Sequence, residues 1–344
     1  MERVKTGIVG LDVILCGGLI ANRSYLVRGQ AGTGKTTLGL HYLTADNSSS
    51  RTNLFISFGE STEQIKENAH AINLSIDDID FLDLSPSSSF FENLETYDIF
   101  SASQVEREPI TSKITETLNT LKPKRVFIDA MTQLNYLSRD TYDFRRYILS
   151  FLRYLMEREI SLIFTSEESD TISDDDLQFI ADGVIHLEQS AERRSARIMK
   201  SRGSAFIGGY HTMRLTDEGM VVYPRLIEPE KEASDFSDKP VVSGIAELDE
   251  MLHGGLERGT VSLITGPTGI GKTTFGLQYT KEAAGRGERS VIYTFEEDDL
   301  TIIRRCEGIS LPIQEMLDNG MLKIEQIEPL QLTADEFAHR VRHE

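Results

Sequence analysis

The chain has 344 residues, an apolar fraction of 39% and a formal net charge of −19. This length allows roughly two domains, and no apolar stretch approaches the ~18 residues of a membrane-spanning helix. The N-terminus lacks the apolar core of a signal peptide. The negative charge disfavours a protein that coats nucleic acid, and is typical of halophile proteins or of an ordinary acidic protein. Cys16 and Cys306 form no disulfide framework or metal-binding pattern, so we expect a reducing cytoplasm and no membrane association.

Strands and helices are expected to alternate along the first two thirds of the chain. The expected strands cover 24–29, 53–58, 124–129 and 160–167, and hairpin strands cover 182–189, 195–202 and 211–222. The expected helices cover 36–45, 62–74, 110–122 and 142–159, and the Ser-rich segment 85–108 is expected to form a loop with a short helix. This order predicts an α/β fold, a mostly parallel sheet flanked by helices.

A long segment of the chain occurs twice. Residues 7–43 match residues 244–280 at a constant offset of 237, with about half of the positions identical and no gap. The repeat predicts strands at 261–266 and 290–295 and a helix at 273–284. We expect a first domain over 1–227, a charged linker over 228–240 and a second domain over 241–344. The counterpart of Asp129 would lie near residue 366, so we expect the second copy to be incomplete and the chain to be C-terminally truncated.

Each copy carries a phosphate-binding loop between a strand and a helix. The loops read GQAGTGKT from Gly29 and GPTGIGKT from Gly266. Glycines let backbone N–H groups converge on phosphate oxygens, where the helix N-terminus adds a favourable dipole. Lys35 and Lys272 can reach the β- and γ-phosphates, and Thr36 and Thr273 can ligate Mg²⁺. The predicted ATP-binding residues are Gly29, Gly32, Thr33, Gly34, Lys35, Thr36, Thr37, Gly266, Thr268, Gly269, Ile270, Gly271, Lys272, Thr273 and Thr274.

Acidic residues at strand ends are candidates for metal binding and catalysis. Asp129 closes the apolar strand VFID and can hold Mg²⁺, although it could instead cap the following helix. Glu60 follows the strand after the first loop and can orient or deprotonate water, although it could be an exposed loop acid. Glu296 and Glu297 follow the corresponding strand of the second copy. Gly59 replaces the first acid of this pair, so the first copy could be slow or inactive.

A basic run lies in the predicted hairpin. It consists of Arg193, Arg194, Arg197, Lys200 and Arg202. Alternation along a strand places Lys200 and Arg202 on one face, from which they could reach a neighbouring subunit's nucleotide. Contact with nucleic acid and a solvated hairpin edge are the alternatives. The consecutive acids 174–176 are read as a capped helix start rather than a metal site.

These motifs together resemble the KaiC-type ATPases of the RecA superfamily. The resemblance rests on TGIVGLDVILCGGL, SGIAELDEMLHGGL, both GKTT loops, TFEE, FID, IFTSE, ADGVIHLE and RIMKSRG. It implies a RecA-like P-loop fold and a ring, commonly a hexamer, with ATP between subunits. It also implies that Lys200 and Arg202 contact the neighbour's nucleotide, and that Glu296 and Glu297 match paired catalytic glutamates. The resemblance suggests an archaeal or halophilic member.

Three functions follow from this reading. The first is an oligomeric, Mg²⁺-dependent ATPase with a signalling or regulatory role, with Ser/Thr autokinase activity as an option for the full-length protein. The second is a recombinase relative that acts on DNA, because the RecA-like fold also hosts that function. The third is a nucleotide-gated scaffold with little turnover, which Gly59 favours.

Overall fold

The computed structural model describes residues 1–45, 53–85, 102–138, 140–167, 174–191, 193–226, 239–309 and 311–343. It separates into two compact units, one formed by Met1–Leu226 with Asp335–Glu344 and the other by Ile227–Ala334. Most of the predicted linker (228–238) and of the Ser-rich segment (86–101) lies outside the described residues. Within the described ranges, no helix is both long and apolar enough to cross a bilayer.

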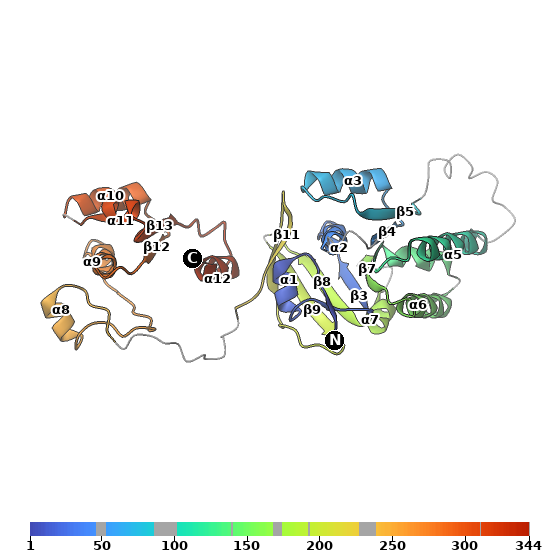
Figure 1. The fold of residues 1–344 in the computed structure, drawn as a ribbon, viewed down its shortest axis with the longest axis horizontal. Coiled ribbons are helices and arrows are strands. Elements are labelled where there is room, and N and C mark those ends of the chain that lie inside the picture. The colour runs from blue at the N-terminus through green and yellow to red at the C-terminus, as the bar shows by residue number, and fades with distance from the viewer. Residues whose placement is uncertain are drawn as a thin grey trace. The chain divides into compact units, whose positions relative to one another are not determined.

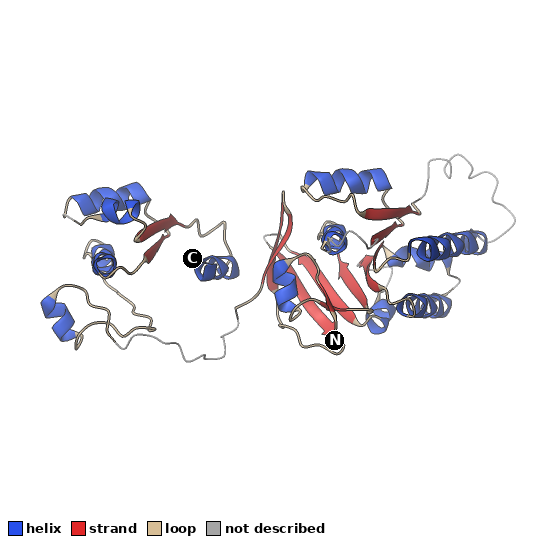
Figure 2. Ribbon diagram, in the orientation of Figure 1, coloured by secondary structure: helices blue, strands red, loops and turns tan. Residues whose placement is uncertain are grey.

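The first unit is built on a nine-stranded sheet in the order β11-β10-β9-β8-β3-β7-β6-β4-β5. In Figure 2 its strands are red and the helices beside them are blue. From β8 to β5 neighbouring strands are parallel, whereas β9, β10 and β11 are antiparallel additions. The fold prediction, a mostly parallel sheet flanked by helices, is therefore confirmed. The strands are β3 (Ser24–Gly29), β4 (Asn53–Ser57), β5 (Ile79–Asp83), β6 (Arg125–Asp129), β7 (Ser161–Glu167), β8 (Gly183–Gln189), β9 (Arg194–Ser201), β10 (His211–Thr216) and β11 (Gly219–Tyr223).

Helices cover both faces of this sheet and create two apolar cores (Figure 1). One core joins the sheet to α1 (Val9–Ile14), α2 (Lys35–Thr44) and α3 (Thr62–Ala71). The other joins it to α5 (Ala102–Leu121), the 3₁₀ segment η2 (Met131–Leu137), α6 (Thr141–Met156) and α7 (Asp175–Ile180). Because both faces are covered, the central strands are apolar at successive positions: every residue from Arg125 to Ile128 is buried. A short antiparallel pair, β1 (Arg3–Val4) with β2 (Leu19–Ile20), completes the part before the sheet.

Local sequence signals explain most helix boundaries. Ser61 and Gln64 form a reciprocal capping box at the start of α3, and the Asp140 carboxylate accepts the Asp143 N–H at the start of α6. Residues 85–108 were predicted to form a loop with a short helix. The prediction was wrong for the last part of this segment, because the long helix α5 begins at Ala102 and continues through Pro109. Ile110, Ile114 and Leu118 pack this helix onto the sheet, so tertiary packing outweighs the missing proline N–H. Strand β5 was not predicted.

Among its described residues, the second unit contains a two-stranded parallel sheet and four helices. Strand β12 (Ser290–Thr294) pairs with β13 (Leu322–Gln326). Its helices are α8 (Ala246–Met251), α9 (Lys272–Gly285), α10 (Asp299–Glu307) and α11 (Ile313–Asp318), and α12 (Ala334–His343) falls almost entirely in the stretch grouped with the first unit.

The predicted strand 261–266 was wrong, because no regular structure forms there. In the first copy the corresponding strand β3 is paired on both sides by β7 and β8. Among the described residues, no strand pairs with 261–266 in the way that β7 and β8 pair with β3. Val261 is consequently fully exposed, and Leu263 is 86% exposed.

The duplication extends to individual hydrogen bonds. The Asp12 carboxylate accepts from the backbone N–H and the hydroxyl of Thr6, and Asp249 accepts the same two bonds from Ser243. Both pairs differ by the offset of 237. The side chain of Asp12 therefore organises the turn before α1 in the first copy, as Asp249 does before α8 in the second.

Candidate functional site: a nucleotide-binding edge

The carboxyl ends of four parallel strands meet at one edge of the first unit's sheet. Strand β3 ends at Gly29, the first residue of the first loop, and β6 ends at Asp129. Register places Ser57 of β4 opposite Asp129, and β7 lies between β3 and β6. Ligands of open parallel sheets bind at this edge. The topology therefore brings together residues that are up to about 100 positions apart in the chain.

The phosphate-binding loop has the backbone that such a loop needs. Gly34 precedes α2 with a left-handed φ of 98°, and Gly271 precedes α9 with 99°. The Lys35 ammonium lies back over the loop and donates to the carbonyl oxygens of Gly29 and Gln30 at 2.7 and 2.9 Å. These two hydrogen bonds hold the Lys35 ammonium against the loop backbone.

Asp129 joins the loop to two strands. Its Oδ2 accepts from the Thr36 hydroxyl at 2.6 Å, and its Oδ1 accepts from the Thr165 hydroxyl of β7 at 2.5 Å. The alternative role for Asp129, a helix cap, is not seen: η2 begins after Ala130 and has no side-chain cap. Thr165 lies in the IFTSE motif, but the sequence offered no signal for its role, because the contact is made across the sheet.

Glu60 lies at the same edge, three residues after the end of β4. The pKa of the Glu60 carboxyl is raised, mainly by partial burial and to a smaller extent by the negative charge of Asp129. The Asn68 amide donates to Glu60 Oε2 at 3.5 Å, and the Ser57 hydroxyl donates to the Glu60 carbonyl. The raised pKa brings this carboxyl closer to the range of a general base, which supports its predicted role.

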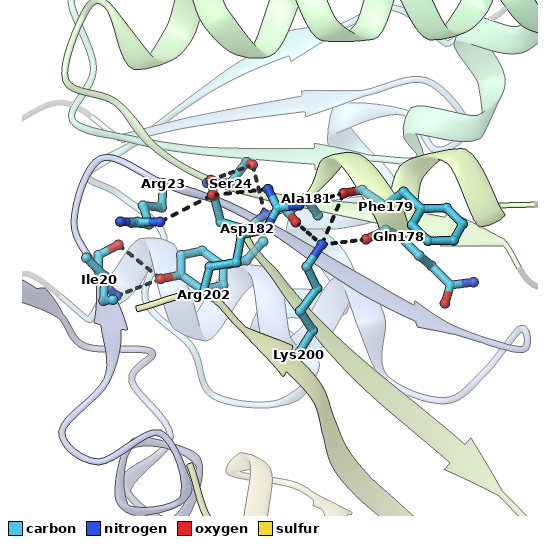
Figure 3. Close-up of polar contacts among 10 residues, drawn as sticks. Ile20, Arg23, Ser24, Gln178, Phe179, Ala181, Asp182, Lys200 and Arg202 are labelled. Carbon is cyan, nitrogen blue, oxygen red and sulfur yellow. Dashed lines mark hydrogen bonds and ion pairs between the residues drawn. The ribbon is translucent and has the colours of Figure 1, made fainter. Parts of the chain in front are cut away.

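Lys200 and Arg202 lie at the opposite edge of the sheet, away from Lys35 of the same chain. Register pairs Lys200 with Val184 and Tyr25 with Gly183, at the beginning of β8 and β3 rather than at their ends. Figure 3 shows both cations pointing toward the end of α7.

The two cations stabilise the end of α7. The Lys200 ammonium donates to the carbonyls of Gln178, Phe179 and Ala181, and Arg202 also donates to Phe179. The pKa of Lys200 is lowered, mainly by burial and to a smaller extent by the positive charge of Arg202. Contact with one shared carbonyl agrees with their predicted position on the same face of the strand.

Arg194, another cation of the basic run, lies at the other end of β9 from Lys200. Arg194 begins β9 at the nucleotide-binding edge, and its Nη2 donates to the Gly32 carbonyl at 3.4 Å. Its Nε is buried, with no hydrogen-bond partner among the described residues. Sequence reasoning did not separate Arg194 from Lys200, although six residues of a strand extend roughly 20 Å.

The second loop repeats the lysine contacts in a more open setting. The Lys272 ammonium donates to the carbonyls of Gly266 and Pro267 at 2.8 and 2.9 Å. Glu297 forms a two-bond ion pair with Arg305, whereas Glu296 is exposed. All residues from 261 to 270 are exposed, because no strand of the described part of the chain pairs with them. The second loop thus repeats the lysine contacts of the first loop without the surrounding sheet of the first unit.

Comparison with known proteins agrees with this geometry. The profile of the KaiC ATPase family matches residues 4–227 and again 241–340. The chain belongs to the KaiC family. The circadian clock oscillator protein KaiC of Parasynechococcus marenigrum is 28% identical over 94% of this chain and 64% of its own length. KaiC 1 of Synechocystis is 29% identical over 94% and 63%, and KaiC of Nostoc is 28% identical over 94% and 63%. The chain spans just under two thirds of each of these relatives.

Mg²⁺ suits the oxygen ligands of the KaiC-type site. Thr36 and Asp129 present a hydroxyl and a carboxylate in direct contact, and Mg²⁺ is commonly held by one or two such groups together with substrate phosphates. Among the described residues there is no cluster of three or more His, Cys, Asp or Glu that could hold an ion alone. The donor set therefore fits an ion that arrives with a nucleotide.

Proposed function

We propose that this KaiC-family chain binds ATP with Mg²⁺ through the first loop and hydrolyses it. The proposal includes KaiC-type domains at 1–227 and 241–344, and a homo-oligomer in the cytoplasm with a signalling role. The observation that carries it is the contact of Asp129 with both Thr36 and Thr165 at the loop. Bound Mg²⁺ would neutralise charge that develops on the phosphates.

In this proposal, the residues of the first copy have separate roles in hydrolysis. Backbone N–H groups of the loop and the start of α2 hold phosphate oxygens, and Lys35 exchanges its two carbonyl partners for them. Thr165 keeps the Asp129 carboxylate turned toward Thr36. Glu60, whose pKa is raised, accepts the proton of the attacking water. We propose that Arg194, beside Gly32, contacts the phosphates of its own copy.

We further propose that Lys200 and Arg202 act on the nucleotide of a neighbouring subunit. Their position at the far edge of the sheet prevents them from reaching the loop of their own chain. A cation supplied by a second subunit stabilises charge in the transition state, as an arginine finger does. The resemblance to KaiC-type rings supports an arrangement with ATP between subunits.

A subunit-mixing experiment tests both proposals. All proteins carry Lys272→Ala, which silences the second loop. One variant adds Lys35→Ala, and the other adds Lys200→Ala with Arg202→Ala. Each variant alone should hydrolyse little ATP. The variant with Lys200→Ala and Arg202→Ala should still bind ATP. Mixed oligomers contain intact interfaces and should regain turnover. Full activity of Lys200→Ala/Arg202→Ala alone contradicts action between subunits, and labelled-ATP binding by Lys35→Ala equal to the parent contradicts the loop assignment.

The second candidate function is a nucleotide-gated scaffold with little turnover. Gly59 occupies the position of Glu296 and favours it, because the first copy keeps a single candidate base. In the Lys272→Ala background, hydrolysis that Glu60→Gln removes supports the ATPase. ATP binding without hydrolysis in the parent supports the scaffold. The resemblance implies autokinase activity only as an option for the full-length protein, and our proposal is limited to hydrolysis.

A further inference from the structure

A cavity of about 380 Å³ lies between the C-terminal ends of α5 and α6, away from the nucleotide-binding edge. Its apolar floor is formed by Leu118, Pro123 and Ile160, and Leu118 and Ile160 are each only 1% exposed. The volume is within the range of small-molecule sites, which are mainly apolar with a few placed polar groups. The cavity is thus large enough to hold a small ligand.

The rim of this cavity is cationic. The described residues that line it include Lys122, Lys124 and Arg158 and no acid, in a chain where acids outnumber bases by 55 to 36. Lys124 is partly neutralised by Glu159 at 3.4 Å. Lys122 is exposed at the end of α5. Positive charge therefore gathers at the opening of this cavity, in a strongly acidic molecule.

Neutral contacts hold Arg158 over the cavity. Its guanidinium lies 3.5 Å above the Tyr154 ring and donates to the Tyr154 carbonyl. It also donates weakly to Asn119 Oδ1, which accepts the Tyr154 hydroxyl as well. Because these partners are uncharged, Arg158 keeps its positive charge available to an anion. Tyr154 and Asn119 connect α6 to α5 and fix the width of the opening.

We propose that this cavity binds a small amphipathic carboxylate, with its apolar chain on the floor and its carboxylate at Lys122 and Arg158. The apolar floor disfavours a purely ionic ligand such as phosphate, and the cations disfavour an uncharged one. The site lies at the start of β6, and Asp129 ends that strand about 13 Å away. It is therefore a site separate from the proposed ATP site.

Calorimetric titration of the whole chain with octanoate tests the site. Saturable binding is expected, and Lys122→Glu should weaken it about tenfold or more, whereas Lys122→Arg should retain it. Lys113→Glu is the matched control, because Lys113 is an exposed lysine of α5, nine residues before Lys122, which directly follows that helix. Lys35→Ala should leave octanoate affinity unchanged, which separates this site from the nucleotide site.

Several outcomes would overturn the proposal. Absence of saturable octanoate binding means that the cations serve only the helix C-termini. Equal weakening by Lys122→Glu and Lys113→Glu means that overall charge, not the cavity, attracts the ligand. Displacement of octanoate by equimolar inorganic phosphate indicates a simple anion site, and equally tight binding of 1-octanol indicates an apolar one. Circular dichroism of each variant checks that the fold is retained.

Discussion

Substitution of Gly39 by alanine should destabilise the first unit, although alanine is the better helix former. Gly39 lies in α2 directly against the ring of Phe127 in β6. A Cβ at this position would come within 2.2 Å of the ring's Cζ and within 2.4 Å of both Cε atoms. Phe127 is fully buried and packs edge-on against Phe55 at 5.0 Å between ring centres. The ring cannot turn away freely, so α2 and β6 must separate.

The expected magnitude is a difference between two effects. Overpacking of a core costs about 1–3 kcal/mol, and replacing glycine by alanine inside a helix stabilises by about 0.5–1 kcal/mol. The net loss therefore lies between about 0 and 2.5 kcal/mol, with a middle value of about 1.3 kcal/mol. With a urea dependence of about 3 kcal/mol per molar, this middle value lowers the unfolding midpoint by about 0.4 M. Since α2 carries Thr36 and β6 carries Asp129, ATP binding by the first loop should weaken too.

The repeat provides the control for this experiment. Gly276 is the counterpart of Gly39 in α9, and a Cβ there would meet nothing within 4 Å. Gly276→Ala should leave the stability unchanged or raise it by up to about 1 kcal/mol. Because the chain has no tryptophan, urea unfolding is best followed by far-ultraviolet circular dichroism. A midpoint for Gly39→Ala equal to or above that of the parent refutes the packing argument.

Three further predictions concern protons and metal. Burial and the charge of Asp129 raise the pKa of Glu60. In the Lys272→Ala background, the hydrolysis rate should therefore begin to fall on acidification at a higher pH than an ordinary glutamate would give. A pH–rate profile without this acidic decline contradicts the assignment of Glu60 as the base. Burial lowers the pKa of His41, whose Nε2 accepts the Met220 N–H, so the unfolded chain takes up the proton first. Stability from His41 is present above its unfolded pKa of 6.5 and is lost as pH falls below it, and His41→Gln should reduce that loss in urea titrations. Chelation of Mg²⁺ should stop hydrolysis and its readdition should restore it; turnover that persists in the chelator excludes the proposed role of Asp129.

Sequence reasoning succeeded where a signal is local and repeated. Both loops, their glycines and the following helices could be predicted, because strand, loop and helix are adjacent in the chain. The strand 261–266 could not, since strand formation depends on partners that lie far away in sequence. The extension of α5 through Pro109 was also missed, because packing against the sheet decided it.

The amino-acid order alone determined the KaiC-type repeat, the phosphate-binding loops and the acids that end core strands, because each depends on residues within one strand–turn–helix unit. The tertiary structure decided which of these residues share a site. The strand order places Thr165 next to Asp129. Because β9 runs antiparallel to β8, Arg194 lies at the sheet edge that carries the first loop, and Lys200 lies at the opposite edge. Pairing between distant strands carries this information, and no local pattern encodes it.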